Sequence, residues 1–258
     1  MLQKTSGATT AVAPDSKTFR VHSGNGLRTP YLLARSPIIG LIMMLIGVSL
    51  FGVLAINLET HGPLLQTDTQ IVNEFHEAEL QSSTLERDTM GAGYYLGEHI
   101  ILAIGALLGI YFLFNRYWTE LMMVVVAWLG EGAIWLSLSH YFNRPRPTFA
   151  LYIWTQAPGP SFPSGHTLSA VMCYGLLAYL LVPKIRLNLW KVFVVLIATL
   201  IIIFVGVSRV YTGDHFPTDV LAGYALGVAW TGLAYTAVEL ISRMIVRHRG
   251  PARSSLDT

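Results

Sequence analysis

The chain has 258 residues, of which 53% are hydrophobic and only 12% are charged. This composition argues against a water-soluble protein and favours a bundle embedded in a bilayer. A formal net charge of +2 is too small to indicate a nucleic-acid partner. The single cysteine, Cys173, excludes an intrachain disulfide, and its apolar surroundings in the sequence predict a packing role.

Apolar runs dominate the chain after a polar start. Residues 1–35 are polar and basic without periodicity, which predicts a flexible tail. The first apolar run, 38–58, is too long for a cleaved signal peptide, so we expect it to stay as a membrane anchor. Further apolar runs lie at about 99–114, 119–138, 166–183, 189–207 and 218–242. Each is close to the ~20 residues that span a bilayer as a helix. We therefore predict an all-α polytopic protein, with a six-helix membrane domain over 36–243 and a basic tail over 244–258.

The distribution of charge predicts how the six spans are oriented. If six spans are counted, the basic tail at the start, the basic turns and the basic end of the chain share one side of the membrane. The basic residues on that side after the first tail are Arg116, Lys184, Arg186, Lys191, Arg243, Arg247, Arg249 and Arg253. The positive-inside rule makes this side, with both termini, cytoplasmic. We expect a plasma (inner) membrane location and an extracytoplasmic active site formed by the loops at 139–165 and 208–217.

The segment 59–97 falls on the same side as those loops and is acidic, with seven carboxylates against Arg87. Two interpretations of this segment stay open. Its apolar residues have a spacing that fits amphipathic helices lying on the outer surface, where they would wall the lipid entrance. These residues are Ile71, Val72, Phe75, Leu80 and Leu85. A solvated connector is equally compatible with the sequence.

His215 and Asp219 form the first pair that suggests chemistry. They are four residues apart, and Pro217 between them fits the first turn of a helix. Asp219 can then reach back to one ring nitrogen of the imidazole and leave the other nitrogen free to act as a nucleophile. The alternative interpretation is a helix cap beside a surface histidine.

Pro163 to His166 open the fourth apolar run and suggest an anion site. Ser164 can cap the helix, while the free N–H groups at its start, beginning with Gly165, point toward an anion. His166 on the first turn can donate a proton to a leaving oxygen. A simple loop-to-helix transition with an incidental histidine is the alternative.

Arginines near these blocks supply planar, permanently charged forks for phosphoryl oxygens. Arg146 and Arg209 fit that role. Snorkelling to lipid headgroups is the alternative, but the positive-inside bias disfavours it on the expected outer face. Arg144 is better interpreted as a supporting or structural residue.

Together the three blocks resemble the signature of the type 2 phosphatidic acid phosphatase superfamily, K-x6-R-P, P-S-G-H and S-R-x5-H-x3-D. The second block is matched by Pro163 to His166. The third is matched at full spacing by Ser208, Arg209, His215 and Asp219. The first is matched only by Arg146 and Pro147, because Ser139, followed by His140, stands where the pattern has lysine.

The resemblance implies a role for each matched residue. In the membrane branch of the family one histidine forms a phosphohistidine and the other protonates the leaving group, which would be His215 and His166. The implied orienting aspartate is Asp219. The implied phosphate-binding residues are Arg146, Ser164, Gly165 and Arg209. Arg144, Ser139 and His140 are possible supporting residues, and neither a metal nor another cofactor is implied.

A lipid phosphate or diphosphate is the implied substrate, since its chain can remain in the bilayer while its phosphate reaches the surface. The resemblance allows undecaprenyl diphosphate, phosphatidylglycerol phosphate, or phosphatidic acid and its diphosphate relative. Undecaprenyl diphosphate is the preferred interpretation, because small bacterial members of the family act on it.

Two other functions stay open: a lipid phosphotransferase using a hydroxyl acceptor, and a catalytically impaired membrane scaffold or transporter. Glu131 within the third apolar run motivates the transporter, since carboxylates inside a membrane often mark a pathway. A hydrogen bond from Glu131 to a neighbouring helix is the simpler explanation. Glu98 at the start of the second run resembles an interfacial residue more than a site residue.

Overall fold

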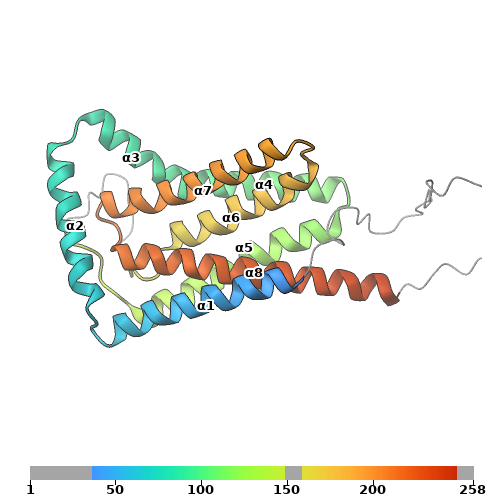
Figure 1. Cartoon of the computed structure of the whole chain (residues 1–258), viewed down its shortest axis with the longest axis horizontal. Helices are drawn as coiled ribbons and strands as arrows, with labels where there is room; N and C mark the ends of the chain where they lie inside the picture. Colours follow the sequence, from blue (N-terminus) through green and yellow to red (C-terminus); the bar gives the residue numbers. More distant parts are fainter. Residues whose placement is uncertain (1–36, 149–158, 249–258) are drawn as a thin grey trace, which may run out of the picture.

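The computed structural model describes residues 37–148 and 159–248, and all regular structure in these ranges is helical (Figure 1). The elements are α1 (Pro37–Glu59), α2 (Leu64–Gln81), α3 (Thr84–Gly97), α4 (His99–Phe114), α5 (Trp118–Phe142), α6 (Gly165–Leu181), the short 3-10 helix η1 (Val182–Lys184), α7 (Asn188–Tyr211) and α8 (Pro217–His248). The expected tail over 1–35 lies outside the described residues, as do residues 249–258. Helix α8 runs six residues beyond the end predicted for the last span.

Six helical segments within the described ranges are long and apolar enough to cross a membrane, which confirms the six-helix prediction. The second segment differs from the expected 99–114. It runs over Thr84–Phe114 and comprises α3 and α4. The physical reason is length, because the 16 residues of α4 reach only about 24 Å at the rise of an α-helix. The hydrocarbon core measures about 30 Å.

The outer faces of the bundle carry apolar side chains, as expected for contact with lipid. Ile56 on α1, Leu107 on α4 and Val192 on α7 are each more than 60% exposed. Inside, Cys173 is fully buried in a cluster with Ile101 and Val205, which confirms its packing role. These helices therefore lack the polar outer face of a helix in a soluble protein and carry apolar residues both inside and outside.

Helices α1 and α8 lie side by side along the bundle (Figure 1). Gly47 permits the close approach, because a Cβ atom at this position would lie 2.5 Å from the carbonyl oxygen of Ala225 and 2.8 Å from the Cα of Ala229. Small residues at such crossings let backbones pack closely where no hydrophobic effect drives helices together. This contact fixes the position of α8, whose first turn carries Asp219.

Helix α2 lies across one end of the bundle, roughly perpendicular to the long helices (Figure 1). Its Ile71, Val72 and Phe75 pack on Val210 and Val220 of α7 and α8. Most of residues 59–97 are thus helical, but α3 belongs to the second apolar segment, and the expected position of these helices on the outer surface stays a prediction. However, Leu80 and Leu85, which we expected on the same apolar face, are more than 60% exposed.

The turn between α2 and α3 is set by a capping box at Ser83. The Ser83 hydroxyl accepts from the Glu86 amide at 3.3 Å, and the Glu86 carboxylate accepts from the Ser83 amide at 2.7 Å. Such reciprocal bonds satisfy two amides at the helix start. They direct α3 back along α7, toward the end of the bundle opposite α2.

Candidate functional site

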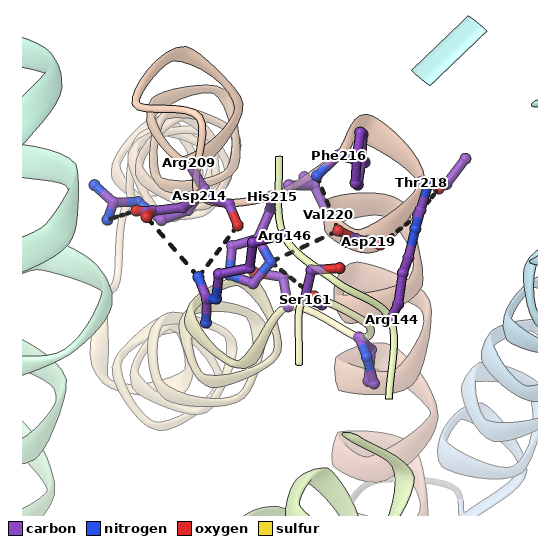
Figure 2. Close-up of polar contacts among 12 residues, drawn as sticks. Arg144, Arg146, Ser161, Arg209, Asp214, His215, Phe216, Thr218, Asp219 and Val220 are labelled. Carbon is purple, nitrogen blue, oxygen red and sulfur yellow. Dashed lines mark hydrogen bonds and ion pairs between the residues drawn. The ribbon is translucent and has the colours of Figure 1, made fainter. Parts of the chain in front are cut away.

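The three sequence blocks meet at the bundle end that α2 crosses. There α6 begins, α7 ends and α8 begins, and Figure 2 shows side chains from α7, from α8 and from the loop after α5 converging. Ser208 and Arg209 belong to the end of α7 and not to the predicted loop. Both are fully buried, and their contacts with the following turn keep the helix intact to Tyr211.

His215 is buried, and its ring is oriented by a main-chain carbonyl. Its Nδ1 lies 2.7 Å from the carbonyl oxygen of Ser161. Because a carbonyl only accepts, Nδ1 carries the hydrogen and donates it, which leaves the lone pair on Nε2. Nε2 is buried and has no hydrogen-bond partner among the described residues. The ring is therefore held in the tautomer that a nucleophile needs.

Asp219 does not provide the contact expected for it. Its Oδ2 lies 3.8 Å from Nδ1 of His215, which is longer than a hydrogen bond. Instead its Oδ1 accepts from Arg144 at 2.6 Å and its Oδ2 accepts from the Phe216 amide at 2.8 Å. The carboxylate is thus committed to an arginine and to the start of α8, and the Ser161 carbonyl orients His215 in its place.

Arg144 is the centre of a buried ion-pair network (Figure 2). It donates to Asp219, to Asp68 at 2.8 Å and to the Thr218 hydroxyl at 2.8 Å. Its guanidinium also lies 4.1 Å from the centroid of the Phe216 ring. The supporting role predicted for Arg144 is consistent with these contacts, which join α2, the loop after α5 and α8.

Sequence reasoning missed Asp68, which is almost fully buried on α2. It accepts from the Thr218 amide at 2.9 Å and from the Thr218 hydroxyl. A signal was present in the sequence, because Asp68 shares a helical face with Ile71, Val72 and Phe75 at spacings of three, four and seven. A carboxylate on the packed face of an amphipathic helix needs a buried partner.

Arg209 and Arg146 lie on the side of His215 away from Arg144 (Figure 2). Arg209 is fully buried and donates from one terminal nitrogen to Asp214 Oδ2 at 2.9 Å, while its other terminal nitrogen has no partner within the described ranges. Arg146 is partly exposed and donates to the carbonyl oxygens of Gly159 and Asp214, each at 3.1 Å. Asp214 thus holds both predicted phosphate-binding arginines, and the sequence did not predict it.

Ser164 occupies the position before α6, as predicted, but its hydroxyl does not cap the helix. Its Oγ is buried without a partner among the residues described. Its amide donates to the carbonyl of Asp219 at 3.0 Å, which ties the start of α6 to α8. Gly165 is required by close approach, since a Cβ there would lie 2.9 Å from Nε1 of Trp135.

His166 faces both His215 and a carboxylate from α3–α4. The centroids of the two histidine rings are 6.3 Å apart. Nε2 of His166 lies 3.4 Å from Oε2 of Glu98, and the Tyr94 ring lies 5.5 Å from the imidazole. Glu98 is therefore next to the site, and its interpretation as an interfacial residue missed this contact.

Ser139 and His140 keep their hydrogen bonds within α5. The buried Ser139 hydroxyl donates to the Leu136 carbonyl at 3.1 Å, and the exposed His140 ring lies 2.8 Å from the same oxygen. In these contacts neither residue supplies the positive charge that the lysine of the family pattern would place here. No group of three or more His, Cys, Asp or Glu side chains in the described part of the chain is arranged to hold a metal ion.

Comparison with known proteins agrees with this geometry. The model of the PAP2 superfamily matches residues 120–243. The undecaprenyl-diphosphatase of Sulfolobus acidocaldarius is 30% identical over 166 residues, which cover 62% of this chain and 73% of that relative. The chain belongs to the PAP2 superfamily.

Other PAP2 proteins match as well. Phosphatidylglycerophosphatase B of Bacillus subtilis is 38% identical over 141 residues, 54% of this chain and 66% of that relative, so the chain spans just under two thirds of its length. The crystal structure of a transmembrane PAP2 type phosphatidylglycerolphosphate phosphatase from Bacillus subtilis aligns with a TM-score of 0.65 and 31% identity. The alignment covers 78% of this chain and 98% of the Bacillus subtilis chain. The shared fold therefore extends beyond the matched residues of the family model.

Proposed function

We propose that the chain is a lipid phosphatase that works through a phosphohistidine on His215. One observation carries the proposal. Nε2 of His215, the free terminal nitrogen of Arg209 and Oγ of Ser164 are buried at one site, and none has a hydrogen-bond partner in the described ranges. Buried polar atoms are seldom left unpaired. A phosphoryl group would give each of them a partner.

The first step transfers the phosphoryl group to the enzyme. Nε2 of His215 attacks phosphorus, the bond from phosphorus to the lipid oxygen breaks, and His166 gives its proton to that oxygen. Arg146, Arg209, the Ser164 hydroxyl and the Gly165 amide hold the phosphoryl oxygens as negative charge develops. The products are a phosphohistidine and a free lipid alcohol or lipid phosphate.

The second step releases phosphate and restores the enzyme. His166, now unprotonated, accepts a proton from water, whose oxygen attacks phosphorus as the bond to His215 Nε2 breaks. In this scheme Arg144, Asp68 and Asp219 are positioning residues. They hold the start of α8 and the loop that carries Ser161, and so keep Nε2 of His215 directed at phosphorus.

We also propose that the site faces the extracytoplasmic side and that no metal takes part. The basic residues at the opposite end of the bundle, in or next to the turns between spans, support this orientation; they are Arg116, Lys184, Arg186 and Lys191. Two relatives are named for phosphatidylglycerol phosphate and undecaprenyl diphosphate, which supports a substrate anchored in the bilayer.

The test is phosphate release by the purified protein in detergent containing EDTA, from a panel of lipid phosphates and diphosphates. We expect release by the wild type, none by His215→Ala, and wild-type release by His76→Ala, a histidine variant on α2 outside the site. If added lipid alcohols suppress release while labelled phosphate moves to them, the protein is a phosphotransferase. Release that persists in His215→Ala, or that EDTA abolishes, would contradict the proposal.

A further inference from the structure

Glu98 lies where the chain breaks between α3 and α4. Its backbone angles, φ −133° and ψ −73°, interrupt the helix, and its side chain is 44% exposed. Its carboxylate lies 3.4 Å from Nε2 of His166, the atom that would protonate the leaving group. The carboxylate therefore stands on the leaving-group side of the site.

Close packing holds this part of the chain against the site. A Cβ atom on Gly97 would lie 3.1 Å from Cδ2 of His166 and 2.9 Å from Cγ1 of Val205. A Cβ on Gly93 would overlap the Ser208 side chain. The ring of Tyr94 also lies 5.6 Å from the Arg209 guanidinium. The close packing of the backbone at Gly93 and Gly97 therefore holds Glu98 beside His166.

The site holds few cations to balance a second phosphate. Arg146 and Arg209 both lie beside the carboxylate of Asp214, at 3.8 and 2.9 Å. Arg144 is neutralised by two carboxylates. Ser139 replaces the lysine of the family pattern.

We propose that Glu98 makes the enzyme select lipid phosphate monoesters over lipid diphosphates. This inference rests on the proposed function, with His166 as the leaving-group acid. From a monoester the leaving group is an uncharged lipid alcohol after protonation. From a diphosphate attacked at its terminal phosphorus, the leaving group is a lipid monophosphate, whose negative charge would lie next to Glu98. Like charges placed together are costly where water is partly excluded.

The experiment compares two lipids that differ only in phosphate number, a phosphatidic acid and the diacylglycerol diphosphate with the same acyl chains. Values of kcat/KM are measured in the same mixed micelles with EDTA. We expect the wild type to favour the monoester, and Glu98→Gln to shift the ratio toward the diphosphate by about tenfold. Glu98→Asp, which keeps the charge, should keep the preference. Glu77→Gln, an exposed change on α2, should leave both activities unchanged.

The outcomes separate this inference from the proposed function. If both lipids release phosphate but the wild type favours the diphosphate, or Glu98→Gln leaves the ratio unchanged, the inference is wrong and the phosphatase stands. If neither of these lipids nor any other member of the lipid panel releases phosphate, the proposed function fails, and the inference fails with it. Glu98→Gln could instead lose both activities. If Glu98→Asp, which keeps the charge, then also shifts the kcat/KM ratio toward the diphosphate, the charge of Glu98 does not determine the preference.

Discussion

Removing Arg144 should destabilise the protein more than removing one partner of a surface ion pair does. In Arg144→Ala, the carboxylates of Asp68 and Asp219 lose their cation while staying buried, at 1% and 0% exposure. Breaking a buried ion pair by removing one partner typically costs about 3–5 kcal/mol, because the remaining charge is left uncompensated. We expect a loss in that range in the free energy of unfolding.

The matched control is Arg186→Ala. Arg186 is exposed in the turn before α7, and among the described residues it pairs with no buried carboxylate. Surface substitutions of this kind usually change the free energy of unfolding by about 0.5 kcal/mol or less. The comparison holds the residue type constant and changes the burial and the pairing of the arginine.

The assay is denaturant unfolding in mixed micelles, followed by the loss of helical circular dichroism. A double-mutant cycle with Asp68→Ala should show strong non-additivity, since the two residues share one network. If Arg144→Ala costs less than about 1 kcal/mol, or its effect simply adds to that of Asp68→Ala, the network does not hold this end of the bundle together.

Three further changes test other parts of the structure. Gly47→Leu should separate α1 from α8 and lower the thermal midpoint in detergent by several degrees, because a side chain there meets the Ala225 backbone; an unchanged midpoint would argue against this packing. Arg209→Lys should lower phosphate release by roughly 10²–10³-fold while the protein stays folded, since lysine lacks the rigid fork that directs one nitrogen to Asp214 and the other to a phosphoryl oxygen; near-normal release would contradict the role of the fork. Glu131→Gln, which keeps a hydrogen-bond partner for Ser169, should change phosphate release by less than about threefold; a large loss would point to a proton pathway.

Much of the fold could be predicted from the sequence, because lipid imposes long apolar helices that satisfy their own backbones. The errors fell where polar residues sit inside helices. Helix α3 has low mean hydropathy, so its sequence does not identify it as part of the second span that it completes. The sequence predicts a loop at Ser208 and Arg209, whereas both are buried in α7, where Asp214 accepts a hydrogen bond from Arg209.

At the site, the sequence reveals the three blocks because the residues of each block lie close together in the chain. It does not reveal the residues that contact the blocks, since these come from distant elements that meet only through packing. Asp68 and Glu98 reach the site from α2 and from the α3–α4 break, and Ser161 acts through its carbonyl, which no side-chain pattern encodes. The preference for undecaprenyl diphosphate rests on family resemblance alone, whereas the role proposed for Glu98 predicts a preference for a monoester.

The most direct test of the mechanism is to trap the phosphorylated enzyme. A monoester with a good leaving group, such as p-nitrophenyl phosphate, needs no protonation in the first step, so His166→Ala should still be phosphorylated but should hydrolyse the intermediate slowly. We expect His166→Ala to accumulate acid-labile, alkali-stable phosphate, mapped to His215 by mass spectrometry and absent from His215→Ala. Phosphate release without any such adduct on His215, or an adduct on another residue, would contradict the account.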